Sequence, residues 1–138
     1  IDAHASAGAA QGVSLKLIKL GGTQALVGAG QFCLTRGLQI NLACKVAETT
    51  ISAAATAHAG FALNLLASQA KNDAQGVAWG FSMSNRYLRD DVCAAPLAPV
   101  RGAVRADQLP LAGLGVVPEL ARLRTFASSS LPVRDFGI

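Results

Sequence analysis

The sequence predicts a mainly α fold with a long Ala-rich central helix, shorter flanking helices and an extended, Pro-containing C-terminal arm. Three observations support this. Hydrophobic residues make up 51% of the 138 residues and charged residues only 14%, whereas a typical soluble domain carries about 25% charged residues. All five prolines lie at or after position 96. Residues 49–70 contain no Asp, Glu, Lys or Arg, as in a buried or membrane helix.

The central helix is predicted over residues 40–70, which contain no proline and only one glycine, Gly60. Helix-forming Ala and Leu dominate this stretch, and apolar residues recur at intervals of four and three, as in a heptad. The seam consists of Ile40, Cys44, Ala47, Ile51, Ala54, His58, Phe61 and Leu65. We therefore expect a continuous helix through Gly60, with Ile51, Phe61 and Leu65 buried.

The flanking segments are less regular. Residues 13–42 carry apolar residues that fit either short helices or two strands, with a break at Gly21 and Gly22. We expect helix there, with two strands or a hairpin as the alternative. A second, shorter helix is predicted from Val77 to Asp91.

The prolines divide the chain into a predicted helical body, residues 1–95, and an extended arm, residues 96–138. Proline restricts its own backbone and that of the preceding residue, so we expect no arm helix longer than about three turns. A short helix is predicted over residues 118–126. Because a solvated tail has no need of apolar runs, we expect five arm residues to lie against protein: Leu109, Leu111, Leu114, Val116 and Phe126.

Sequence motifs give no support for catalysis. The chain lacks a phosphate-binding glycine loop, a complete dinucleotide fingerprint, a paired-histidine zinc motif and a Gly-x-Ser-x-Gly nucleophile motif. The odd number of cysteines, Cys33, Cys44 and Cys93, predicts buried thiols, with one disulfide plus one free thiol as the alternative. We therefore expect no enzymatic activity, no cofactor and no metal.

The net charge of +4 comes from scattered Arg and Lys residues rather than from a basic run. Nucleic-acid binding needs clustered cations near aromatic residues, so this function is not expected. Aromatic and Arg residues instead concentrate in residues 79–89, the types that are enriched at protein interfaces. The predicted interface residues, from this stretch and the arm, are Trp79, Phe81, Arg86, Tyr87, Arg89, Leu111, Leu114 and Phe126.

The charge-free residues 49–70 are long enough to cross a hydrocarbon core of about 30 Å, and burial among other helices is the alternative. We expect a non-catalytic structural or accessory subunit of a larger, membrane-associated assembly, with other protein subunits, and lipid, as partners. The start at Ile1 fits a processed protein of an organelle or one exported from a bacterium. The alternatives are a self-assembling subunit of an extracellular filament or coat, and a small helical protein that binds lipid or another ligand.

Overall fold

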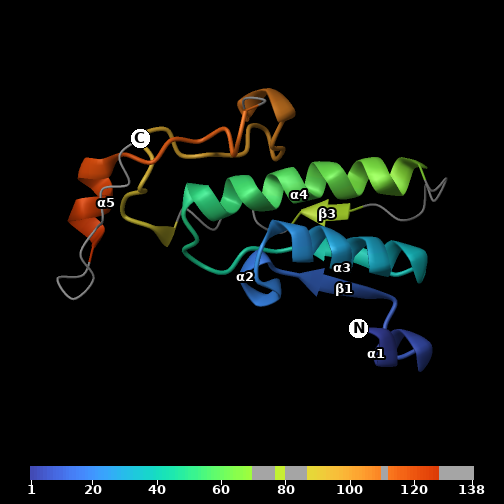
Figure 1. The fold of residues 1–138 in the computed structure, drawn as a ribbon. Coiled ribbons are helices and arrows are strands. Elements are labelled where there is room, and N and C mark those ends of the chain that lie inside the picture. Colours follow the sequence, from blue (N-terminus) through green and yellow to red (C-terminus); the bar gives the residue numbers. More distant parts are fainter. Residues whose placement is uncertain (70–76, 80–86, 110–111, 128–138) are drawn as a thin grey trace.

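The chain builds helices around a small parallel β-sheet (Figure 1). The structure is a computed structural model, which describes residues 1–69, 77–79, 87–109 and 112–127. In chain order the elements are α1 (Asp2–Ser6), β1 (Gly12–Leu15), α2 (Leu17–Leu20), α3 (Thr23–Thr35), β2 (Gln39–Leu42), α4 (Thr50–Gln69), β3 (Val77–Trp79), the 3₁₀ helix η2 (Ala106–Gln108) and α5 (Leu120–Phe126).

The predicted mainly α class is wrong because the sheet has three parallel strands, in the order β1-β2-β3. Gly12 of β1 lies opposite Gln39 of β2, and Ile40 of β2 lies opposite Val77 of β3. Helices predominate in the described residues, yet the chain is not plainly mainly α and does not fall plainly into another class. The ambiguous residues 13–42 contain both helices and strands, and residues 77–79, predicted to start a helix, form β3.

The central helix begins ten residues later than predicted, at Thr50 rather than Ile40. Residues 39–42 alternate polar and apolar side chains, the period of a half-buried strand, and they form β2. The seven-residue connection after β2 contains Ala47 with φ of 63°, which is incompatible with a continuous α-helix. From Thr50 the helix runs unbroken through Gly60 to Gln69, as expected.

The burial pattern of α4 also differs from the prediction. Ile51 and Phe61 are half-buried, and Leu65 is 59% exposed. The predicted heptad seam assumed a single packed face, but α4 lies between two layers (Figure 1): α3 and the sheet on one side and the arm on the other. Small side chains, including Ala54, Ala57 and Ala59, therefore supply much of its buried surface.

The first hydrophobic core fills the space between the sheet and its helices. α3 packs on β1 and β2, and α4 packs on α3 and β3. Leu15, Ile40, Leu42 and Val77 contribute the strand side of this core. At its centre α3 and α4 approach closely, because a Cβ atom on Gly30 would lie 2.5 Å from Cδ2 of Leu63.

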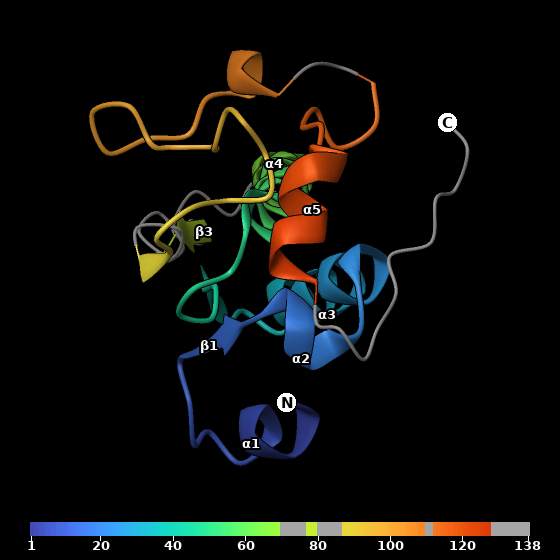
Figure 2. The same cartoon turned by 90° about the vertical axis from the view of Figure 1, so that its left-hand side faces the viewer.

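The arm covers the other side of α4, and Figure 2, which looks along this helix, shows the same layering. A second, smaller core contains Leu97 and Leu109 from the arm against Ala53, Ala54 and Ala57 of α4. The buried position of Leu109 agrees with expectation. The only described α-helix of the arm, α5, has seven residues, which confirms that the arm carries no long helix in its described part.

Candidate interaction surface

The structure describes the side chains of four of the eight predicted interface residues. Tyr87 and Arg89 are exposed beyond β3, whereas Leu114 and Phe126 belong to the arm, with exposures of 38% and 52%. The expected burial of Leu114 and Phe126 is therefore wrong: neither side chain belongs to the second core, although the backbone carbonyl of Leu114 lies 3.2 Å from Nε2 of His58 on α4. Val116 is half-buried against that core. Trp79 ends β3; Phe81, Arg86 and Leu111 lie outside the described residues.

Sequence reasoning missed a different surface, the face of the sheet that points away from the helices. In Figure 2, β1 and β3 lie on one side of α3 and α4. Gly12, Ser14 and Gln39 are exposed there, and Asn41 is half-buried. The side-chain amide of Asn41 donates a hydrogen bond of 3.1 Å to Oγ of Ser14 across the two strands. We call these four residues the open sheet face.

The open sheet face is polar because side chains of a strand alternate between its two faces. Val13 and Leu15 of β1 turn toward the first core, as do Ile40 and Leu42 of β2. All-parallel sheets elsewhere are covered on both faces, but in the described part of this chain helices cover only one. The alternation in residues 39–42 was the sequence signal that could have revealed this surface.

A buried polar clasp at residues 91–97, where the body passes into the arm, attaches the chain to the start of α4, because Thr50 bonds to both Asp91 and Leu97. One carboxylate oxygen of Asp91, Oδ2, accepts hydrogen bonds from the backbone N–H of Thr50, at 2.9 Å, and from its hydroxyl, at 3.0 Å. The other oxygen accepts from the backbone N–H of Cys93. Asp91 is buried, so these donors compensate its desolvation, and its negative charge stabilises the N-terminus of α4.

Arg122 of α5 completes the clasp from the outside. Its guanidinium forms ion pairs with Asp90 and Glu119 and donates to the backbone carbonyl of Asp91. Hydrogen bonds from the backbone N–H of Asp91 and from Arg122 lower the pKa of Asp90. The hydrogen bonds that Arg122 donates to the carboxylates of Glu119 and Asp90 raise the pKa of Arg122. This exposed network ties α5 to residues 90 and 91, although surface ion pairs of this kind contribute little to stability.

All three cysteines are thiols rather than disulfides, and two of them, Cys33 and Cys93, are buried. Burial raises the pKa of the Cys33 and Cys93 thiols, and Asp91 and Glu119 raise that of Cys93 further. A raised pKa keeps a thiol protonated and unreactive at neutral pH. Cys44 is half-buried beside the second core. Within the described ranges no group of three or more His, Cys, Asp or Glu side chains is placed to hold a metal ion.

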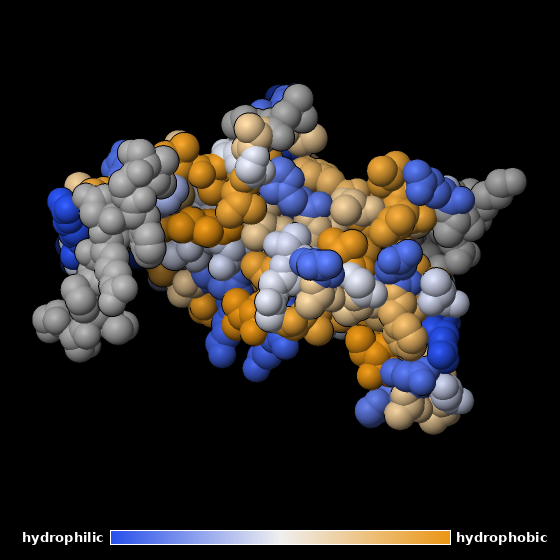
Figure 3. Space-filling model, viewed as in Figure 1, coloured by the Kyte–Doolittle hydropathy of each residue, from blue (hydrophilic) through white to orange (hydrophobic). Residues whose placement is uncertain are grey.

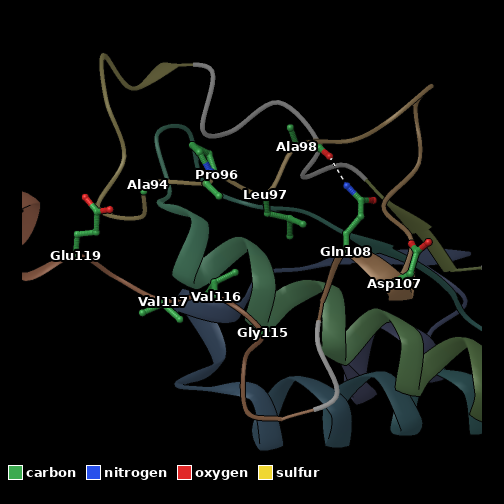
Figure 4. Close-up of a pocket in the computed structure, with 11 residues that line it drawn as sticks. Ala94, Pro96, Leu97, Ala98, Asp107, Gln108, Gly115, Val116, Val117 and Glu119 are labelled. Carbon is green, nitrogen blue, oxygen red and sulfur yellow. Dashed lines mark hydrogen bonds between the residues drawn. The ribbon is translucent and has the colours of Figure 1, made fainter. Parts of the chain in front are cut away.

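A groove of about 560 Å³ lies between two extended stretches of the arm (Figure 4). Leu97 and Val116 provide apolar lining, and Gln108 spans one side by donating to the carbonyl of Ala98 at 2.9 Å. The acidic groups on its rim, Asp107 and Glu119, already pair with Arg residues of the same chain. The described lining of the groove therefore presents no unpaired charge.

Apolar side chains are also exposed in α5 and in the stretch of the arm that leads to it, and Figure 3 shows apolar surface in this region. The exposed residues there are Leu114, Val117, Leu120 and Phe126.

Helix α4 is the one described helix that is long and apolar enough to cross a membrane, but more than half of its most apolar window is buried inside the protein. A core helix of a soluble protein passes the same test, so this finding is weak support for a membrane span.

Comparison with known proteins identified no relative. No family model matches the chain, and neither the curated proteins nor the solved structures include a significant match.

Proposed function

We propose that this chain is a structural component of a larger protein assembly and that its open sheet face docks against another part of that assembly. The observation that carries the proposal is the parallel sheet, of which the helices in the described part of the chain cover only one face. Parallel sheets are stable when both faces are packed. A partner that covers Ser14 and Asn41 would supply the missing layer.

The composition supports the same proposal. Only 14% of the residues are charged, and the large apolar side chains Val117, Leu120 and Phe126, in and just before α5, remain exposed in the structure. Exposed apolar patches on a soluble protein commonly mark interaction surfaces. The proposal does not require a membrane, because the helix that suggested one is packed between the sheet and the arm.

The test is recovery of the assembly by a tagged chain from cells that express the protein. Asn41→Lys places a charge on the open sheet face, where the side chain can reach water in the isolated chain. We expect this variant to lose its stoichiometric partner while its thermal unfolding in isolation stays near that of the wild type. The matched control is Gln31→Lys on the exposed side of α3, which should retain the partner. Equal recovery with both variants would contradict the proposal.

The filament or coat alternative is favoured by one observation, the exposed strand β1 at the sheet edge, because unpaired strand edges promote self-association. Mass measurement of the purified chain in plain buffer separates the two functions. A single high-mass homopolymer would support self-assembly, and a chain that stays small until a different protein is added would support the proposed role.

A further inference from the structure

We propose that the segment crossing α4 is a strap that opens as a unit while the sheet and its helices stay folded. The strap consists of residues 91–109 and 112–119. Its opening uncovers a face of α4 that the closed molecule buries, formed by Ala53, Ala54 and Ala57. This conformational change is independent of the proposed docking at the open sheet face.

The strap is closed on itself, so it can leave α4 without losing its own shape. Its two ends meet where Cys93 pairs with Pro118 in an antiparallel bridge. Between the ends, the side-chain amide of Gln108 donates a hydrogen bond of 2.9 Å to the carbonyl of Ala98 (Figure 4). A compact loop whose ends lie close together and whose polar groups bond internally can open as one cooperative unit.

Two side chains of α4 carry hydrogen bonds to the strap. The hydroxyl of Thr50 donates to Oδ2 of Asp91 at 3.0 Å and accepts from the backbone N–H of Leu97 at 3.1 Å. About two turns further along the helix, Nε2 of His58 lies 3.2 Å from the carbonyl oxygen of Leu114. Because Thr50 is completely buried and its hydroxyl bonds twice, we identify it as the latch that holds the strap closed.

The apolar contact beneath the strap is small. Leu97 and Leu109 are the buried strap residues of the second core, and they meet alanine side chains of α4. The free energy of burial scales with the apolar area removed from water, and an alanine side chain supplies little of it. In the first core, by contrast, Leu26, Leu42 and Leu63 are completely buried. The strap should therefore open at a lower free energy than the sheet side unfolds.

Native-state hydrogen exchange of the full chain compares two backbone amides. The N–H of Leu97 bonds to Thr50 across the latch, and the N–H of Ala43 bonds to the carbonyl of Leu15 at the end of the sheet. We expect lower protection at Leu97 and a weaker dependence of its exchange on urea, because that dependence grows with the surface exposed on opening. Equal protection and equal urea dependence of the two amides would overturn the proposal.

The variant Leu63→Ala separates opening of the strap from unfolding of the whole molecule. It weakens the first core, which stays folded when the strap opens. The protection of Ala43 should therefore fall, while that of Leu97 stays unchanged. If the molecule opened only as a whole, both amides would lose protection by the same factor and the proposal would fail. Should Leu63→Ala not fold, the urea dependence of the two amides in the wild type answers the same question.

A second set of variants tests the latch. Thr50→Val removes the hydroxyl and nearly keeps the shape of the side chain, so exchange at Leu97 should be about tenfold faster, which corresponds to about 1.4 kcal/mol. Thr50→Ser keeps the hydroxyl and should accelerate this exchange much less. The matched control is Thr56→Val on the same helix.

The hydroxyl of Thr56 is also completely buried, but it has no hydrogen-bond partner in the described part of the chain. Its removal should therefore leave exchange at Leu97 no faster than in the wild type. No acceleration in Thr50→Val, or an equal acceleration in Thr56→Val, would exclude Thr50 as the latch.

Discussion

The two layers that sandwich α4 are held by different kinds of contact. On the sheet side, large side chains such as Leu26, Leu42 and Leu63 are completely buried. On the arm side, the large buried side chains are fewer, and the buried carboxylate of Asp91 links the segment to the helix. One helix can therefore hold two layers by different kinds of contact. The sheet side depends on packing, and the arm depends on a few directional contacts.

The largest expected effect is at the centre of the sheet-side core. Leu63→Ala should lower the free energy of unfolding by about 2–5 kcal/mol, because truncation leaves a cavity among fully buried neighbours. The matched control is Leu65→Ala two residues away, where the side chain is 59% exposed and the loss should be below about 0.5 kcal/mol. Urea unfolding measures both. Similar losses would show that the two faces of α4 do not differ as described.

A second pair of variants examines the close approach of α3 and α4. Gly30→Ala should destabilise the protein by about 1–3 kcal/mol, because the new methyl group would overlap Leu63. Gly28→Ala, on the same helix, meets nothing within 4 Å and should stabilise by up to about 1 kcal/mol through helix propensity. The two substitutions are therefore expected to change the free energy of unfolding in opposite directions. A gain in stability for Gly30→Ala in thermal unfolding would contradict the close packing.

The arm should respond most to loss of its clasp. Asp91→Ala removes the acceptor for Thr50 and Cys93 and should cost about 1–2 kcal/mol, typical of a lost helix cap. Asp91→Asn keeps one acceptor oxygen and should therefore lose less stability than Asp91→Ala. Because the clasp holds the arm, limited trypsin digestion of Asp91→Ala should cut faster at Arg101 and Arg105 than digestion of the wild type. Unchanged cleavage rates would indicate that the second core holds the arm without the clasp.

The smallest effect concerns the exposed part of the clasp. The pKa of Asp90 in the folded protein lies below its ordinary value of 3.8, chiefly because the N–H of Asp91 bonds to its carboxylate. A lowered pKa means that the ionised group stabilises the fold above about pH 3.8 and that this contribution is lost as the pH falls further. Unfolding of the wild type and Asp90→Asn should therefore differ slightly at pH 7 and converge in acid. A constant difference across this range would exclude the carboxylate charge as the cause.

The sequence alone was sufficient to predict a helix through Gly60, because residues 50–69 contain neither a charged residue nor a proline. It was not sufficient for the boundary at Thr50. An Ala-rich sequence matches helical spacing in many registers. The predicted heptad seam was therefore extended wrongly into β2, where the alternation of residues 39–42 indicates a strand. Placing β2 beside β1 and β3 depends on tertiary packing, which overrides local preference.

The candidate surface was less predictable than the fold. The pattern around Ser14 and Asn41 is visible in the sequence, but whether a strand face is covered depends on where helices from other parts of the chain lie. The clasp could not be predicted from the sequence either, because an Asp-Asp pair gives no local sign that Asp91 will cap a helix that begins 41 residues earlier. The exposed positions of Leu114 and Phe126 likewise depend on the path of the arm.

The distance along the chain between Thr50 and Asp91 also has a consequence during synthesis. At elongation rates of about 5–20 residues per second, the 41 residues that separate them take roughly 2–8 s to translate. The first turn of α4 is therefore synthesised before the carboxylate that caps it. Through this interval the helix lacks its Asp91 cap, so the clasp closes only after that residue has been made.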